Sequence, residues 1–63
     1  MSLPGLTYAD TWAVINALNV AAEVYTADAR NFELSGDTRS AEGFRNQAAN
    51  ARRIADALEQ AAP

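Results

Sequence analysis

The sequence predicts an all-α protein, an antiparallel helical hairpin that assembles into a four-helix bundle dimer or a higher homo-oligomer. Two long segments with almost no proline or glycine flank the stretch "ELSGDTRS", which is rich in residues that end and begin helices. In both segments apolar residues recur at alternating intervals of three and four, the spacing of helices that pack along a seam. The 63 residues make one small domain, near the lower limit for folding alone.

The first helix is expected over residues 7–34, after a leader of residues 1–6 that contains a proline and a glycine. Thr7 and Asp10 have the spacing of a capping box, in which each side chain accepts a hydrogen bond from the other residue's backbone N–H. Asp10 also places a negative charge at the positive end of the helix dipole. No proline or glycine interrupts this range, so we expect one unbroken helix.

The chain is expected to reverse at residues 35–38 and to form a second helix over residues 39–61. Gly36 tolerates the left-handed conformation that ends many helices, because it has no Cβ atom to clash. Asp37 and Thr38 are both residue types favoured at the N-cap of the helix that follows. A connection this short makes the two helices antiparallel neighbours.

Each helix is expected to present one apolar seam to the other. The seam of the first helix consists of Ile15, Leu18, Ala22, Tyr25, Ala29 and Phe32. The seam of the second consists of Phe44, Ala48, Ala51, Ala55, Leu58 and Ala62. The alanines let the helix axes approach closely, and the two phenylalanines are expected to meet near the turn. Gly43 is the one weak position inside the second helix, at a cost of about 1 kcal/mol relative to alanine.

The first helix carries more apolar surface than one neighbouring helix can cover. At 100° per residue, Ala13, Ala17, Val20, Ala21 and Val24 lie on its far side. Five residues are expected to meet a second copy, namely Ala13, Ala17, Val20, Val24 and Ile54, the last of which flanks the seam of the second helix. Exposed apolar patches mark association surfaces, so we predict that these five residues form a homo-oligomer interface. The alternative is that exposed alanines carry no meaning, which leaves two valines unexplained.

Composition and charge exclude several classes of function. The net charge of −3 and the pI near 4.5 argue against duplex nucleic acid as a partner, since such binding depends on clustered cationic residues. Cysteine and histidine are absent, which removes the commonest transition-metal ligands. No apolar run is long enough to span a bilayer, and the N-terminus lacks a charged segment followed by an apolar one. We expect a cytoplasmic protein without a metal or cofactor.

The chain also offers little for catalysis. General acid–base chemistry needs a group with a pKa near the working pH, and the acids here are carboxylates on or beside polar helix faces: Glu23, Asp28, Glu42, Asp56 and Glu59. Neither the Glu-x-x-His pattern of di-metal bundles nor a glycine-rich phosphate loop is present. The sequence therefore predicts a protein that is not an enzyme.

Side chains on the wetter side of the first helix are candidates for ligand binding. Trp12 is expected there beside Asn16 and Asn19. Its indole is either a contact anchor or a platform on which a base stacks, unless the leader covers it through Leu3 or Leu6. The two asparagines are either hydrogen-bonding partners for a ligand or part of a solvated face.

Arg45 and Arg52 lie one heptad apart on one flank of the second helix. In one interpretation they pair within that helix, Arg45 with Glu42 and Arg52 with Asp56, at a few tenths of a kcal/mol per pair. In the other, two copies bring four guanidinium groups together to hold a phosphate or a carboxylate. The spacing alone leaves both open.

Residues 40–61, "SAEGFRNQAANARRIADALEQA", resemble the second helix of short two-helix accessory proteins of the anti-defence type, encoded by phages and prophages of GC-rich bacteria. The matching positions are Ala41, Glu42, Phe44, Arg45, Gln47, Ala48, Ala51, Arg52, Ile54, Ala55 and Asp56. The resemblance implies a phage product in the host cytoplasm that acts by stoichiometric binding.

The resemblance implies two modes of action. In the first, a homo-oligomer sequesters a small anionic ligand, such as an immune nucleotide second messenger, in pockets lined by Trp12, Asn16, Asn19, Arg45 and Arg52. In the second, the protein occludes a host protein. A purely structural or assembly role is a third hypothesis, and we rank ligand sequestration first.

Overall fold

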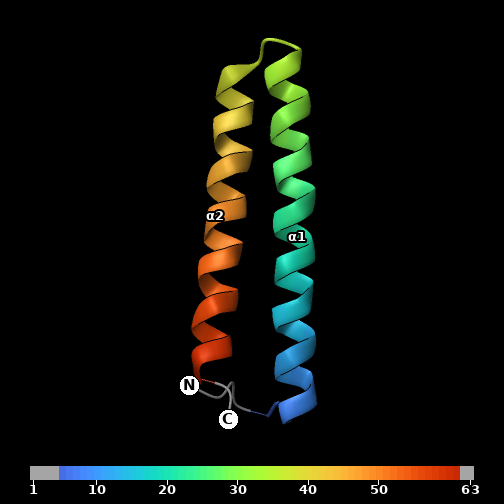
Figure 1. Cartoon of the computed structure of the whole chain (residues 1–63), viewed down its shortest axis with the longest axis vertical. Coiled ribbons are helices and arrows are strands. Elements are labelled where there is room, and N and C mark those ends of the chain that lie inside the picture. The colour runs from blue at the N-terminus through green and yellow to red at the C-terminus, as the bar shows by residue number, and fades with distance from the viewer. Residues whose placement is uncertain (1–4, 62–63) are drawn as a thin grey trace.

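The computed structural model describes residues 5–61, which form two α-helices and no strand (Figure 1). Helix α1 spans Tyr8–Leu34 and helix α2 spans Thr38–Ala61. The helices run antiparallel, side by side along a rod of 43 × 16 × 14 Å. The predicted all-α hairpin is confirmed, and α2 begins one residue earlier than expected. Ala62, assigned to the second seam, and Leu3, a candidate cover for the tryptophan, lie outside the described residues.

The start of α1 is fixed by the predicted capping box. The backbone N–H of Thr7 donates to Asp10 Oδ2 at 3.0 Å, and the backbone N–H of Asp10 donates to Thr7 Oγ1 at 3.1 Å. Thr7 itself has extended backbone angles, φ −78° and ψ 171°. Two of the backbone donors left free at a helix start are thereby satisfied.

The turn ends α1 in a Schellman motif. The backbone N–H of Asp37 donates to the carbonyl of Phe32 at 2.9 Å, and that of Gly36 donates to the carbonyl of Glu33 at 3.1 Å. Gly36 has a φ of 88°, in the left-handed region where residues with a Cβ are strained. Gly36 is therefore the residue that lets the chain reverse within three positions.

Asp37 caps α2. Its Oδ1 accepts the backbone N–H of Ser40 at 3.0 Å, and its Oδ2 accepts the Ser40 hydroxyl at 2.7 Å. Both Asp37 and Thr38 are possible N-caps from the sequence. The contacts with Ser40 show that Asp37 is the residue that caps the helix. Because the aspartate takes the cap, Thr38 becomes the first residue of the helix.

Replacing Asp37 with asparagine is expected to keep the cap at neutral pH, since both residue types cap helices well, and to remove its response to acid. The hydrogen bonds from the Ser40 hydroxyl and backbone N–H lower the pKa of Asp37 below its ordinary value of 3.8. A carboxylate with a lowered folded-state pKa stabilises the fold above its unfolded pKa, and this stability is lost as the pH falls through the folded pKa.

Thermal melts across acidic pH measure this effect. The melting temperature of the wild type should fall relative to that of Asp37→Asn once the pH drops below 3.8, and it should hold a constant offset at higher pH. An offset that stays constant into strong acid would contradict this role for the carboxylate.

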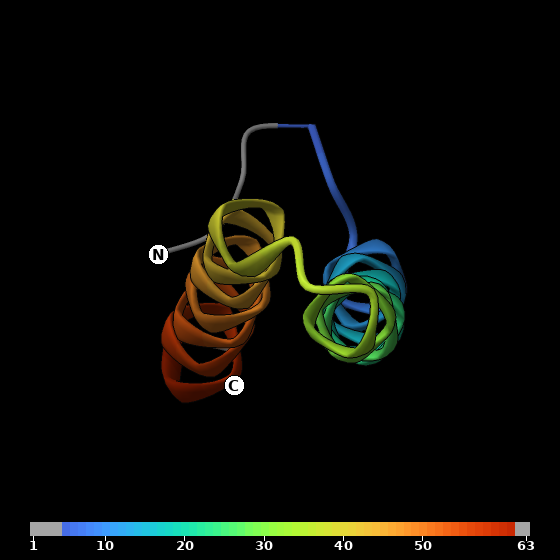
Figure 2. The same ribbon diagram turned by 90° about the horizontal axis from the view of Figure 1, so that it is seen from above.

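The core between the helices consists mainly of alanine. Of the eight buried apolar residues within residues 5–61, six are alanines and only Ile15 and Leu58 are larger. Six of the eight form two clusters: an open-end cluster of Ile15, Ala55 and Leu58, and a central cluster of Ala22, Ala48 and Ala51. Seen from above, the helix axes are inclined to one another (Figure 2), as expected of small side chains packed along two seams.

Aromatic side chains close the hairpin near its turn. The rings of Phe32 and Phe44 stack with centroids 5.4 Å apart, as the sequence predicts, and Tyr25 lies 6.1 Å from Phe44. All three rings are half-buried. The aromatic groups of the seams therefore lie at the rim of the interface between α1 and α2, while alanines, Ile15 and Leu58 form its buried part.

Candidate functional site

Four of the predicted interface residues, Ala13, Ala17, Val20 and Val24, lie exposed on α1. We call these four residues the outer face of α1. Val20 is 59% exposed and Val24 is 53% exposed. Ile54, the fifth predicted interface residue, is half-buried and packs against the open-end cluster, so it contributes to the core of the hairpin itself.

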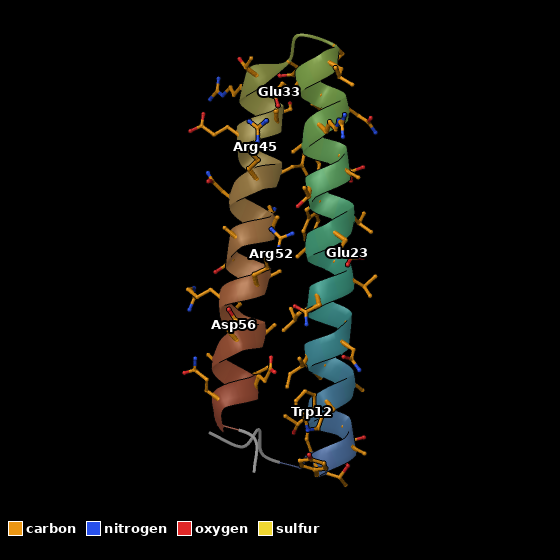
Figure 3. The ribbon with its side chains drawn as sticks, viewed as in Figure 1. Trp12, Glu23, Glu33, Arg45, Arg52 and Asp56 are labelled. Atoms are coloured by element: carbon orange, nitrogen blue, oxygen red, sulfur yellow. The ribbon has the colours of Figure 1, made fainter. Side chains whose placement is uncertain are left out.

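One edge of the hairpin, where α1 and α2 meet, is polar. Two bonds between side chains of the two helices define it, Arg45 to Glu33 and Arg52 to Thr26, and Figure 3 shows both arginines reaching from α2 toward α1. Residues at heptad intervals from these share the same edge. This polar edge carries, on α1, Trp12, Asn19, Thr26 and Glu33, and, on α2, Arg45, Arg52 and Glu59.

The first interpretation of the arginines, pairing within α2, is wrong. Arg45 forms a salt bridge with Glu33 of α1 rather than with Glu42, and both side chains are about half exposed. A pair this exposed stabilises the fold by about 1 kcal/mol or less. It nonetheless balances the Arg45 charge with a carboxylate from the facing helix.

Arg52 differs from Arg45 in having a neutral partner. Its Nη2 donates to Thr26 Oγ1 at 3.3 Å, rather than to Asp56. The Thr26 hydroxyl donates its own proton to the carbonyl of Ala22 at 2.8 Å, which leaves its lone pairs for the guanidinium. Among the described side chains no carboxylate lies within salt-bridge distance of Arg52, so its charge is available to an anion.

Trp12, on the polar edge, is a half-buried side chain. It packs against the open-end cluster with the Tyr8 ring edge-on at 6.2 Å. Its Nε1 is buried, and among residues 5–61 no acceptor lies within hydrogen-bonding distance of it. Leu6, one of the two residues expected to cover it, is 39% exposed. The indole therefore acts first as a core residue at the open end.

The structure separates the predicted ligand-binding residues. Trp12 and Arg45 lie near opposite ends of the rod (Figure 3), and Thr26, the partner of Arg52, is about 21 Å along α1 from Trp12 at 1.5 Å per residue. Asn19 lies on the polar edge between them, and Asn16 is exposed nearer the outer face of α1. One small ligand cannot touch both ends of this set within a single hairpin.

The opposite edge of the hairpin, which sequence reasoning did not single out, is largely apolar. Tyr25 and Phe32 lie on it. Each comes directly before a residue of the polar edge, Thr26 or Glu33, and is therefore turned away from that edge by 100° about the helix axis. We call it the aromatic edge. It also includes two half-buried residues of α1, Val14 and Ala21, and one of α2, Ile54. The signal in the sequence is a second set of apolar residues in α1 that connects the seam to the outer face.

Across residues 5–61 the ionisable groups form no concentrated site. No group of three acidic side chains is arranged to hold a metal ion there. Within the same residues, neither helix has an apolar stretch long enough to cross a membrane. The chemically distinctive features are therefore an exposed apolar surface on α1 and one arginine with a neutral partner.

Comparison of the chain with protein-family models, with curated proteins and with solved structures finds no match. The geometry of the hairpin is thus the basis for the function proposed below.

Proposed function

We propose that the protein is not an enzyme and acts by association, with hairpins packing together through the apolar surface of α1 as a homo-oligomer. The observation that carries this proposal is the exposure of Val20 and Val24, each more than half accessible to solvent. A four-helix bundle of two hairpins is the simplest closed arrangement.

The distribution of side-chain size supports the same proposal. A core made mostly of alanine buries little apolar area per residue. Apart from the buried Ile15 and Leu58, large apolar groups such as the aromatic rings near the turn, Val20 and Val24 are half-buried or exposed. Burying one valine contributes about 1.5–3 kcal/mol, so a second copy that covers Val20 and Val24 adds a large share of the stability available to a domain this small.

The test is the molar mass in solution across a concentration series, by light scattering or sedimentation equilibrium. The proposal expects a mass above that of the monomer at micromolar concentration. A strictly monomeric chain contradicts it and favours the alternative in which the same surface occludes a host protein.

A second function, sequestration of a small anionic ligand by the oligomer, is favoured by Arg52. Its guanidinium has a neutral partner and stands on the polar edge, and guanidinium groups suit phosphate and carboxylate. The separation of Trp12 from Arg45 means that such a pocket needs residues from two hairpins. An immune nucleotide second messenger, the ligand class implied by the resemblance to phage anti-defence proteins, is the proposed ligand for this function.

Replacing Arg52 with alanine is expected to weaken nucleotide binding at least tenfold, in line with the loss of one charge-assisted contact of about 1.5–3 kcal/mol. The matched control is Arg53→Ala, which removes the same charge from a side chain bonded only to Asn50 of its own helix. Isothermal titration with a panel of mono-, di- and cyclic nucleotides measures both. Equal losses in the two variants, or no binding by the wild type, would argue against sequestration.

A further inference from the structure

Gly43 has no role that the hairpin itself explains. It lies inside α2, its φ is not positive, and a Cβ atom added there would meet, beyond its chain neighbours and the surrounding turns of its own helix backbone, no atom of the described residues within 4 Å. Glycine inside a helix lowers the equilibrium constant for helix formation roughly fivefold relative to alanine. Neither backbone strain nor close packing within the chain accounts for this loss.

The surface around Gly43 is hollowed. Ser40, Gly43, Phe44 and Gln47 line a shallow depression of about 250 Å³. The depression is open to solvent, and its volume exceeds that of one aliphatic side chain. Its apolar wall is the Phe44 ring, which stacks on Phe32.

The hollow belongs to the aromatic edge. Ser40, Gly43 and Gln47 are spaced by three and four residues, and Ile54 follows one heptad later, so all four share one side of α2. On α1 the same edge continues through Ala21 to the outer face, and Asp28, one heptad after Ala21, places a half-buried carboxylate on it. The apolar surface with the hollow therefore spans both helices.

The side of the rod that carries this surface is large enough for a second copy of the chain. The side of the rod measures 43 × 16 Å, which is comparable with the roughly 800 Å² that each partner buries in a standard interface. The face is exposed and elongated, so a second two-helix rod of the same length can pack along it. In a twofold dimer the same surface of each copy forms the interface, so no other surface is needed.

We propose that a second hairpin docks on the aromatic edge and places an apolar side chain in the hollow above Gly43. The absence of a side chain at this position is what allows the second copy to approach α2. This inference rests on the self-association proposed above and specifies where it occurs.

Replacing Gly43 with leucine tests directly whether a side chain of a second copy docks in the hollow. Leucine is the better helix former and meets open space in the hairpin, so the melting temperature of the dilute monomer should rise by about 4–8 °C. The same side chain fills the hollow, so the dissociation constant of the homo-oligomer should rise at least tenfold. Gly43→Ala should show the same gain in melting temperature with a smaller loss of assembly.

The matched control is Ala49→Leu, at an exposed position of α2 that lies away from the aromatic edge. It adds similar bulk and should leave the dissociation constant unchanged. Sedimentation equilibrium supplies the constants, and circular dichroism supplies the melting temperatures.

The outcomes separate the inference from the proposed function. If the wild type assembles and the Gly43→Leu variant assembles equally tightly, docking in the hollow is wrong and self-association still holds. A wild type that stays monomeric overturns both. A raised dissociation constant in Gly43→Leu, with an unchanged constant in Ala49→Leu, supports docking in the hollow.

Discussion

Replacing Val20 and Val24 together with glutamate is expected to convert the protein into a monomer. Each copy loses the burial of two valines, about 1.5–3 kcal/mol apiece, and would have to bury unpaired charges in the interface. The dissociation constant should therefore rise on the order of a hundredfold or more. The measurement is molar mass against concentration by light scattering.

The double variant leaves the hairpin itself intact. Both valines are more than half exposed, and glutamate is a better helix former than valine, so far-ultraviolet circular dichroism should show unchanged or greater helicity in dilute samples. Asn46→Glu with Ala49→Glu, at two exposed positions of α2, is the control for added negative charge. Assembly that persists in the Val20/Val24 variant would exclude the outer face of α1 from the interface.

Replacing Ile15 with alanine is expected to have the largest effect on folding. Ile15 is 1% exposed and is the one large side chain among residues 5–61 that is essentially fully buried. Deleting buried methyl and methylene groups from such a site destabilises by about 2–5 kcal/mol. In a chain of this size that is a large fraction of the total stability, so the variant should be largely unfolded or melt at a much lower temperature.

Leu34→Ala provides the control, because it removes a similar apolar side chain from a position that is 79% exposed. Its effect should stay within about 0.5 kcal/mol. Urea denaturation must be compared at one protein concentration, since association with other copies adds to the apparent stability. Similar midpoints for the two variants would mean that the open-end cluster does not hold the hairpin together.

Local features of the fold could be predicted because they depend on neighbours in the sequence. The Thr7–Asp10 capping box and the left-handed Gly36 arise from residues within four positions of each other. The alternation of three and four in the apolar residues likewise follows from the helical repeat. The stacked contact between Phe32 and Phe44 follows in turn, because a tight turn brings these two seam positions together.

Contacts between the helices were harder to predict. The arginine pairs were expected within α2, whereas Arg45 reaches Glu33 and Arg52 reaches Thr26. A partner in the same helix is one or two turns away by sequence, but a partner across the hairpin depends on the axial register of α1 against α2. The alanine core sets that register, since it brings the helices close enough for side chains to meet across the edge.

The sequence by itself determined two helices, a tight reversal between them and the side of each helix that faces the other, because hydrogen bonding and hydrophobic periodicity are local properties. Only the tertiary structure decided which edge is polar, where Trp12 packs and why Gly43 lies beside an open hollow. These depend on how two inclined helices meet in space, which fixes the exposure of every residue at the rim.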